Sequence, residues 1–204
     1  MQQMARYNRT QILPIVLILV IIVVAIVALV SAARMIFFSN TTTTSSSDLS
    51  SSQQALIDTS VGREVRMAVR GPIVASEDFR SYQIVINSSN RILTVFEGYN
   101  NKVLSKTKLS NTVAAYEQLV YALNRAGFMN GNELTGDSND VRGICATGQL
   151  YDFQILNQGE KVKDLWTTSC SSARGSFNSS LTTIKKLFTV QIPDIRSKTS
   201  NLGF

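Results

Sequence analysis

The sequence predicts an α+β protein that combines one membrane-spanning helix with one folded domain outside the cytoplasm. An uncharged apolar run covers residues 12–33, and a segment rich in Ser and Thr follows it. Beyond that segment, apolar residues recur first at strand spacing and then at helix spacing. Within the 204 residues, the folded domain is expected at 61–193, with an antiparallel sheet of about six strands and two packing helices.

The apolar run is the predicted membrane anchor. Residues 12–33 read ILPIVLILVIIVVAIVALVSAA, without a charge. About 20 apolar residues in a helix cross roughly 30 Å of hydrocarbon. The run lacks the polar face of a core helix, and it exceeds the apolar region of about 7–15 residues in a signal peptide. Cleavage after Ala32 or Ala33 remains the alternative to a retained anchor in the lipid bilayer.

Basic residues beside the run predict its orientation. Arg6 and Arg9 precede it, whereas Arg34 is the one basic residue on the other side before Arg63. Because Lys and Arg favour the cytoplasmic side, residues 1–11 are expected inside the cell and the domain outside, at the cell surface or in a periplasm-like space. These three flanking arginines also supply half of the net charge of +6, so no nucleic-acid partner is expected.

The segment between the membrane and the domain is expected to be a stalk, followed by strands. Residues 34–60 include SNTTTTSSSDLSSS, which lacks a core-forming pattern. In REVRMAVR the apolar residues alternate with charged ones, as in a half-buried strand. Two β-rich runs then flank NSSN, which predicts a hairpin, and VLSKTKL predicts a further strand.

Two segments show helical spacing. In SNTVAAYEQLVYALNRAGF, Ser110 or Asn111 can cap the start, while Gly127 and Phe128 are typical of a Schellman ending. The second helix is expected in NSSLTTIKKLF, capped by Asn178 and followed by Pro193. Residues 194–204 are expected to form a flexible tail.

The two cysteines, Cys145 and Cys170, are predicted to form a structural disulfide. They bracket the hairpin sequence CATGQLYDFQILNQGEKVKDLWTTSC. A zinc site would need further ligands, and a redox pair would need Cys-x-x-Cys spacing. A disulfide agrees with a domain in an oxidising compartment.

The hairpin register is predicted from its turn. A four-residue loop, 156–159, ends at Gly159 and opposes Ile155 to Glu160. Counting outward, this register opposes the two cysteines directly. It also gathers five apolar side chains on one face, which are those of Tyr151, Phe153, Ile155, Val162 and Trp166.

Four basic residues are the candidate contacts for an anion or a partner. Arg142 and Arg174 lie just outside the cysteines, so the disulfide would bring them together beside flexible glycines. Lys161 and Lys163 are expected together on the hairpin face opposite the aromatic residues.

Several chemistries are excluded or poorly supported, so no cofactor and no enzyme activity are expected. The absence of histidine excludes Ser-His-Asp and Cys-His catalysis. Ser105 and Lys108 form a Ser-x-x-Lys on a predicted strand, where alternation separates the two side chains. The acidic loop 137–140 lacks the ligand frame of an EF-hand.

The chain resembles small, uncharacterised membrane-anchored proteins of host-attached candidate-phyla bacteria of the Saccharibacteria type. The similar segments are RSYQIVINSS, NRAGF and IKKLFTVQIPD. This resemblance implies a bacterial envelope setting and carries no site motif. The function expected is a tethered, non-enzymatic binding module whose partner is an envelope or host-surface protein or glycan. The alternatives are an accessory subunit of a secretion or pilus-biogenesis machine, and an enzyme that uses carboxylates or Ser and Lys.

Overall fold

The computed structural model describes residues 22–23, 50–171 and 175–200. The predicted cytoplasmic segment 1–11, the anchor 12–33 apart from Ile22 and Val23, and the stalk as far as residue 49 lie outside the described residues. Among the residues described, no helix combines the length and the hydropathy that crossing a bilayer requires. Residues 1–47 and 48–204 form separate units, and the fold below is that of the second unit.

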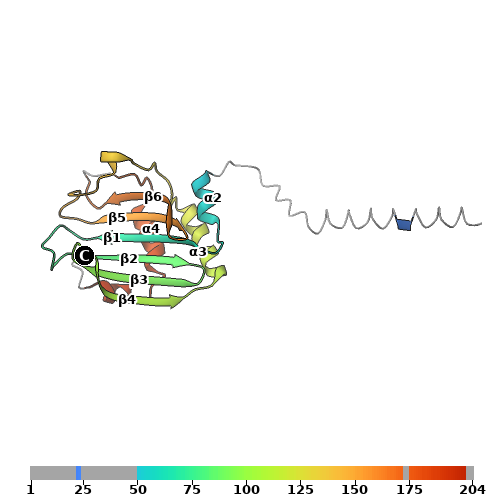
Figure 1. The fold of residues 1–204 in the computed structure, drawn as a ribbon, viewed down its shortest axis with the longest axis horizontal. Coiled ribbons are helices and arrows are strands. Elements are labelled where there is room, and N and C mark those ends of the chain that lie inside the picture. The colour runs from blue at the N-terminus through green and yellow to red at the C-terminus, as the bar shows by residue number, and fades with distance from the viewer. Residues whose placement is uncertain (1–21, 24–49, 172–174, 201–204) are drawn as a thin grey trace, which may run out of the picture. The chain divides into compact units, whose positions relative to one another are not determined.

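Six strands form one antiparallel sheet, as the sequence predicts (Figure 1). The order across the sheet is β4-β3-β2-β1-β5-β6, so that β1 lies beside both β2 and β5. The strands are β1 (Arg63–Arg70), β2 (Arg80–Asn87), β3 (Asn90–Glu97), β4 (Lys102–Ser110), β5 (Leu150–Asn157) and β6 (Glu160–Thr168). The predicted NSSN turn joins β2 to β3.

The two predicted helices are α3 (Val113–Arg125) and α4 (Leu181–Thr189), and both begin slightly later than predicted. The cap of α3 is Thr112, because Ser110 ends β4 and the Asn111 amide donates to the carbonyl oxygen of Asn87. The cap of α4 is Ser180 instead of Asn178. Each cap hydroxyl accepts from a backbone N–H of the first turn.

The C-terminus of α3 has the predicted Schellman geometry. Gly127 has φ +73°, a conformation that glycine adopts without a steric penalty. The N–H of Phe128 donates to the carbonyl oxygen of Leu123 at 2.9 Å, and the N–H of Gly127 donates to that of Asn124. This ending turns Phe128 back into the core, where it is fully buried.

Two short helices extend the domain beyond its predicted ends. Helix α2 (Ser51–Ile57) lies in the segment predicted to be stalk, where Ser50 and Gln53 form a capping box. It contributes Leu56, which is 1% exposed, to the core. Helix α5 (Ile195–Thr199) occupies part of the predicted tail, and its first residue, Ile195, packs against the core. A 3₁₀ turn, η1 (Gly136–Asn139), lies between α3 and β5.

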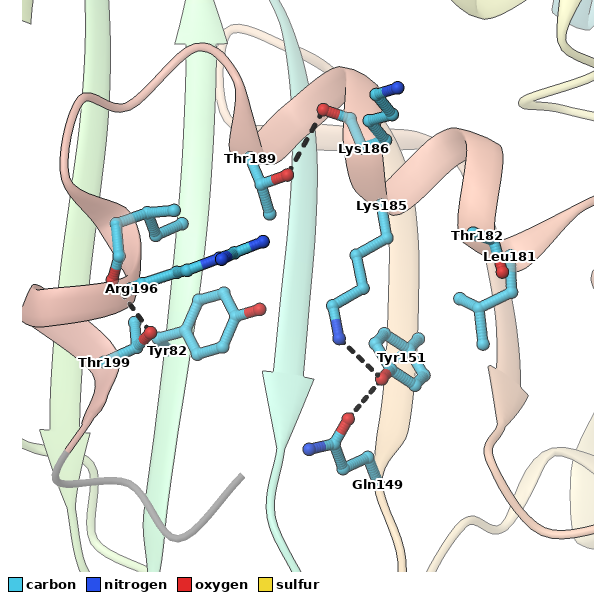
Figure 2. A pocket seen from close by; sticks show the side chains of 11 residues that line it. Tyr82, Gln149, Tyr151, Leu181, Thr182, Lys185, Lys186, Thr189, Arg196 and Thr199 are labelled. Carbon is cyan, nitrogen blue, oxygen red and sulfur yellow. Dashed lines mark hydrogen bonds between the residues drawn. The ribbon is translucent and has the colours of Figure 1, made fainter.

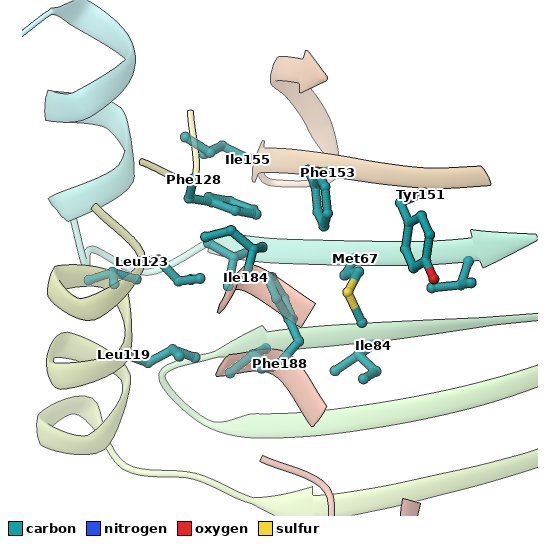
Figure 3. Packing of buried hydrophobic residues seen from close by; sticks show 14 of the residues in the cluster. Met67, Ile84, Leu119, Leu123, Phe128, Tyr151, Phe153, Ile155, Ile184 and Phe188 are labelled. Atoms are coloured by element: carbon teal, nitrogen blue, oxygen red, sulfur yellow. The ribbon is translucent and has the colours of Figure 1, made fainter. Parts of the chain in front are cut away.

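The core lies between one face of the sheet and helices α2, α3 and α4 (Figure 3). Met67, Ile84 and Phe153 point from neighbouring strands toward the helices, and all three are fully buried. The ring of Phe128 lies 5.8 Å from that of Phe153 and 5.5 Å from that of Phe188 on α4. These contacts define the helix face of the sheet, and we call the opposite side the β face.

The predicted register of the β5–β6 hairpin is wrong. The turn contains two residues, Gln158 and Gly159, with φ of +53° and +87°, instead of four. Positive φ at both central positions belongs to the tight turn whose twist matches that of paired strands. A β-bulge next to Ile155 then shifts the pairing, so that Phe153 opposes Leu165 and not Val162.

The corrected register changes which residues are core. Leu165 is fully buried on the helix face, whereas Val162 is 40% exposed. Trp166 opposes Asp152, so its side chain lies on the β face. It does not lie on the face shared by Tyr151, Phe153 and Ile155, as predicted. On the β face its indole N–H donates to Asn139 Oδ1 at 3.0 Å, and a close approach to Gly175 leaves no room for a Cβ atom at that glycine. The partner of Phe153 is thus shifted by three residues, from Val162 to Leu165, and it is again apolar and lies on the buried face.

Replacing Phe153 with Ala should lower the free energy of unfolding by about 3–5 kcal/mol, because the cavity left at the centre of the core cannot fully collapse. Val103→Ala on the exposed edge strand β4 is the matched control and should change stability by less than about 0.5 kcal/mol. Urea unfolding followed through Trp166, the single tryptophan, measures both values. Equal effects of the two substitutions would contradict this core.

Candidate functional site

The disulfide lies beyond the paired ends of β5 and β6. The sulfur atoms of Cys145 and Cys170 are 2.01 Å apart and the Cα atoms 5.6 Å apart, which confirms the predicted pairing. The two residues belong to loops and not to a continued ladder, since pairing ends at Leu150 and Thr168. A Cβ atom at Gly148 would lie 2.6 Å from the Cys145 sulfur, so the loop needs glycine there.

A large cavity opens on the β face at this end of the sheet, and we call it the β-face cavity. Its volume is about 790 Å³. The loop 71–79 between β1 and β2 and the loop 141–149 before β5 contribute to its walls, and the Ile73 N–H donates to the carbonyl oxygen of Ala146 at 2.7 Å to join them. The side chains that line it from the sheet include those of Ala68, Arg70, Ser81, Gln83, Phe96 and Asp152.

The walls of the β-face cavity are mostly apolar and aromatic. Phe79 and Tyr99 stack with their ring centroids 4.2 Å apart, and the Tyr99 hydroxyl donates to the carbonyl oxygen of Val74 at 2.8 Å. Ile144 and Leu150 add aliphatic surface. Apolar walls with a few polar groups are typical of a small-molecule site.

Asp152 is the polar group that stands out among the lining residues. Alternation along β5 places it on the β face, between the buried Tyr151 and Phe153. Its Oδ1 atom is inaccessible to solvent and has no hydrogen-bond partner among the described residues. A buried oxygen without a partner costs about 1–3 kcal/mol, so it marks a strained or functional position.

Burial and a neighbouring carboxylate raise the pKa of Asp152 to about 7, from an ordinary value of 3.8. Burial is the larger cause, and the negative charge of Asp164 adds to it. The positive charges of Lys161 and Arg66 act in the opposite direction. Asp164 is itself held in place, because Lys161 Nζ and Gln154 Nε2 donate to its two oxygens at 2.5 and 3.1 Å.

The structure brings one of the two predicted arginines to the cavity. Arg142 lines it, but its guanidinium donates to both oxygens of Asp140, at 2.5–2.9 Å. These hydrogen bonds lower the pKa of Asp140 to about 2. Arg142 therefore already has an anionic partner, while Arg174 lies outside the described residues.

The two predicted lysines do not share a face. The bulge in β6 separates them, so that Lys163 opposes Ile155 on the helix face and Lys161 opposes Leu156 on the β face. Lys163 Nζ donates to the carbonyl oxygens of Met129 and Gly131 at 3.0 and 3.3 Å. Both lysines thus have partners within the domain, and neither lines the β-face cavity.

Breaking the disulfide should lower the stability of the domain. The closed loop between Cys145 and Cys170 implies about 3–4 kcal/mol of stabilisation by chain entropy. Urea unfolding of the double variant Cys145→Ala/Cys170→Ala should show this loss. Reductant should then destabilise the wild-type chain by a similar amount and leave the variant unchanged; labelling of both thiols without reductant would contradict the pairing.

The pKa of Asp152 predicts a pH-dependent stability. The folded chain keeps a proton on Asp152 up to pH about 7, whereas the unfolded chain releases it near pH 3.8. Stability due to this residue therefore falls as pH rises from about 4 to 7, by on the order of 4 kcal/mol. Asp152→Asn should remove this loss, so the variant should gain stability relative to wild type over that range. An equal difference at pH 4 and pH 8 would refute the raised pKa.

No protein-family model matches the chain, and neither does any curated protein or solved structure. The function is therefore inferred from the chemistry of the domain itself.

Proposed function

We propose that residues 50–200 form a non-enzymatic binding module and that the β-face cavity is its binding site. The apolar run 12–33 would tether this module to a membrane, with the module on the extracytoplasmic side. The proposal is carried by Asp152, the single carboxylic acid in a largely apolar lining that also includes Arg70 and Arg142, with a buried oxygen that lacks a partner among the described residues.

The ligand that fits this cavity has an apolar body and a primary amine. The stacked rings of Phe79 and Tyr99 offer a flat surface to an aromatic or aliphatic group. An ammonium group in the cavity would donate to the carboxylate of Asp152, which lines it, and balance its charge once the proton has left. The ligand would thus supply a cationic partner to the one side chain with a buried, unpartnered polar atom among the described residues.

The same lining argues against catalysis in the cavity. Asp152 is the single carboxylic acid among the lining residues, whereas glycoside hydrolysis uses two carboxyl groups. Ser81 is 6% exposed and lies in the lining without a basic partner among the described hydrogen bonds, so nothing activates it as a nucleophile. A binding role accounts for Asp152 without a second catalytic group.

Tryptamine is a suitable probe, because it joins an aromatic ring to a primary amine. Titration of the full-length chain in detergent should show saturable binding, and affinity should rise between pH 6 and 8 as Asp152 loses its proton. Asp152→Asn should weaken binding at pH 8 at least tenfold and remove its pH dependence. Asp137→Asn, an exposed change of the same kind outside the cavity, should leave affinity unchanged.

Indole-3-propionate replaces the amine with a carboxylate and tests the same contact. It should bind at least tenfold more weakly than tryptamine at pH 8, because its charge would repel that of Asp152. Equal binding of both probes, or no effect of Asp152→Asn, would refute the role assigned to Asp152. Turnover of either probe would overturn the non-enzymatic assignment.

A further inference from the structure

A second cavity lies on the helix face, at the same end of the sheet, and we call it the helix-face pocket. It has a volume of about 540 Å³ and lies between α4, α5 and the start of β5 (Figure 2). Eleven residues line it. They include Tyr82 and Tyr151 from the sheet, Lys185, Lys186 and Thr189 from α4, and Arg196 and Thr199 from α5.

The charge of the helix-face pocket has a single sign. Lys185, Lys186 and Arg196 are the ionic side chains in its lining, and no acidic residue accompanies them there. None of the three forms an ion pair within the described part of the chain. Lys185 and Arg196 extend toward the cavity, whereas the Lys186 side chain points away from it (Figure 2). An anion bound between the first two cations would be stabilised.

Lys185 is placed toward the floor of the pocket by neutral groups alone. Its Nζ atom donates to the Tyr151 hydroxyl at 3.2 Å, and that hydroxyl donates to Gln149 Oε1 (Figure 2). The same Nζ atom lies 5.3 Å from the centroid of the Tyr151 ring. Lys185 is thus a half-buried ammonium in a defined position, and no acidic side chain of the described residues pairs with it.

Two hydroxyls of the pocket are engaged within their own helices. The Thr189 hydroxyl donates to the carbonyl oxygen of Lys186, and the Thr199 hydroxyl donates to that of Ile195. The guanidinium of Arg196 instead extends over the cavity beside Tyr82 (Figure 2). Recognition in this pocket would therefore depend on the ammonium and guanidinium groups.

We propose that the helix-face pocket binds a phosphate ester. A phosphate monoester carries nearly two negative charges near neutral pH and several acceptor oxygens, so it matches the two facing cations, Lys185 and Arg196, better than a carboxylate with a single charge does. The planar guanidinium of Arg196 can donate two hydrogen bonds to it, while Lys185 contributes a point charge. The rings of Tyr82 and Tyr151 offer surface to the organic part of the ester. This site is separate from the β-face cavity and does not depend on the function proposed for it.

Glucose 6-phosphate, glucose and acetate test the proposal on the full-length chain by isothermal titration calorimetry. Glucose 6-phosphate should bind saturably with one site, and affinity should fall as salt increases. Lys185→Gln and Arg196→Gln should each weaken binding at least tenfold. Lys198→Gln removes the same charge from α5 outside the pocket lining and should change affinity less than twofold.

Three results would overturn the proposal: no binding of glucose 6-phosphate at millimolar concentration, equal binding of acetate, or an equal loss on Lys198→Gln. The last result would show attraction to the net charge and not to the pocket. Asp152→Asn should leave this binding unchanged, so the two sites can be tested independently. Unfolding curves of each variant establish that a loss of binding does not reflect a loss of fold.

Discussion

The packing of Phe128, Phe153 and Phe188 decides the role of every strand residue in this domain. These rings seal α3 and α4 against one face of the sheet. Because side chains alternate along a strand, fixing Phe153 on the helix face sends Asp152 and Gln154 to the opposite face. Both candidate cavities follow from this choice, since each is bounded by one face of the same strands.

The β face is covered at one end by loops, and this cover changes its chemistry. The disulfide anchors loop 141–149 next to the ends of β5 and β6, and Gly148 allows the close contact with its sulfur atoms. Loop 71–79 joins it through the hydrogen bond from Ile73 to Ala146. A carboxyl group on this face would ionise freely in water, but under such cover the pKa of Asp152 rises to about 7. The disulfide therefore contributes to the site indirectly, by holding its cover.

The two cavities differ in charge although the same strands separate them. The β-face cavity combines aromatic walls with a carboxyl, that of Asp152, and two arginines, Arg70 and Arg142. All the ionic residues that line the helix-face pocket are cationic. Arg142 and the two predicted lysines are already paired with groups of the domain. Lys185 and Arg196 form no ion pair within the described residues, although Lys185 donates to the Tyr151 hydroxyl. They are better candidates for contacts with an anion, because binding would not first have to displace a carboxylate.

The sequence alone determined the α+β class, the antiparallel sheet, the ending of α3 at Gly127 and the cysteine pair, because these depend on local periodicity, on glycine conformation and on the spacing of two unique residues. It also indicated that Tyr151, Phe153 and Ile155 share one face of β5. Tertiary structure decided the register of β5 and β6, since a two-residue turn and a bulge outweighed the apolar pattern that favoured Val162. It also decided both sites: Asp152 lines one cavity together with loops distant in sequence, and Lys185 and Arg196 line the other because α4 and α5 both border it. Contacts between residues so far apart in the sequence depend on long-range packing, which no local pattern in the chain encodes.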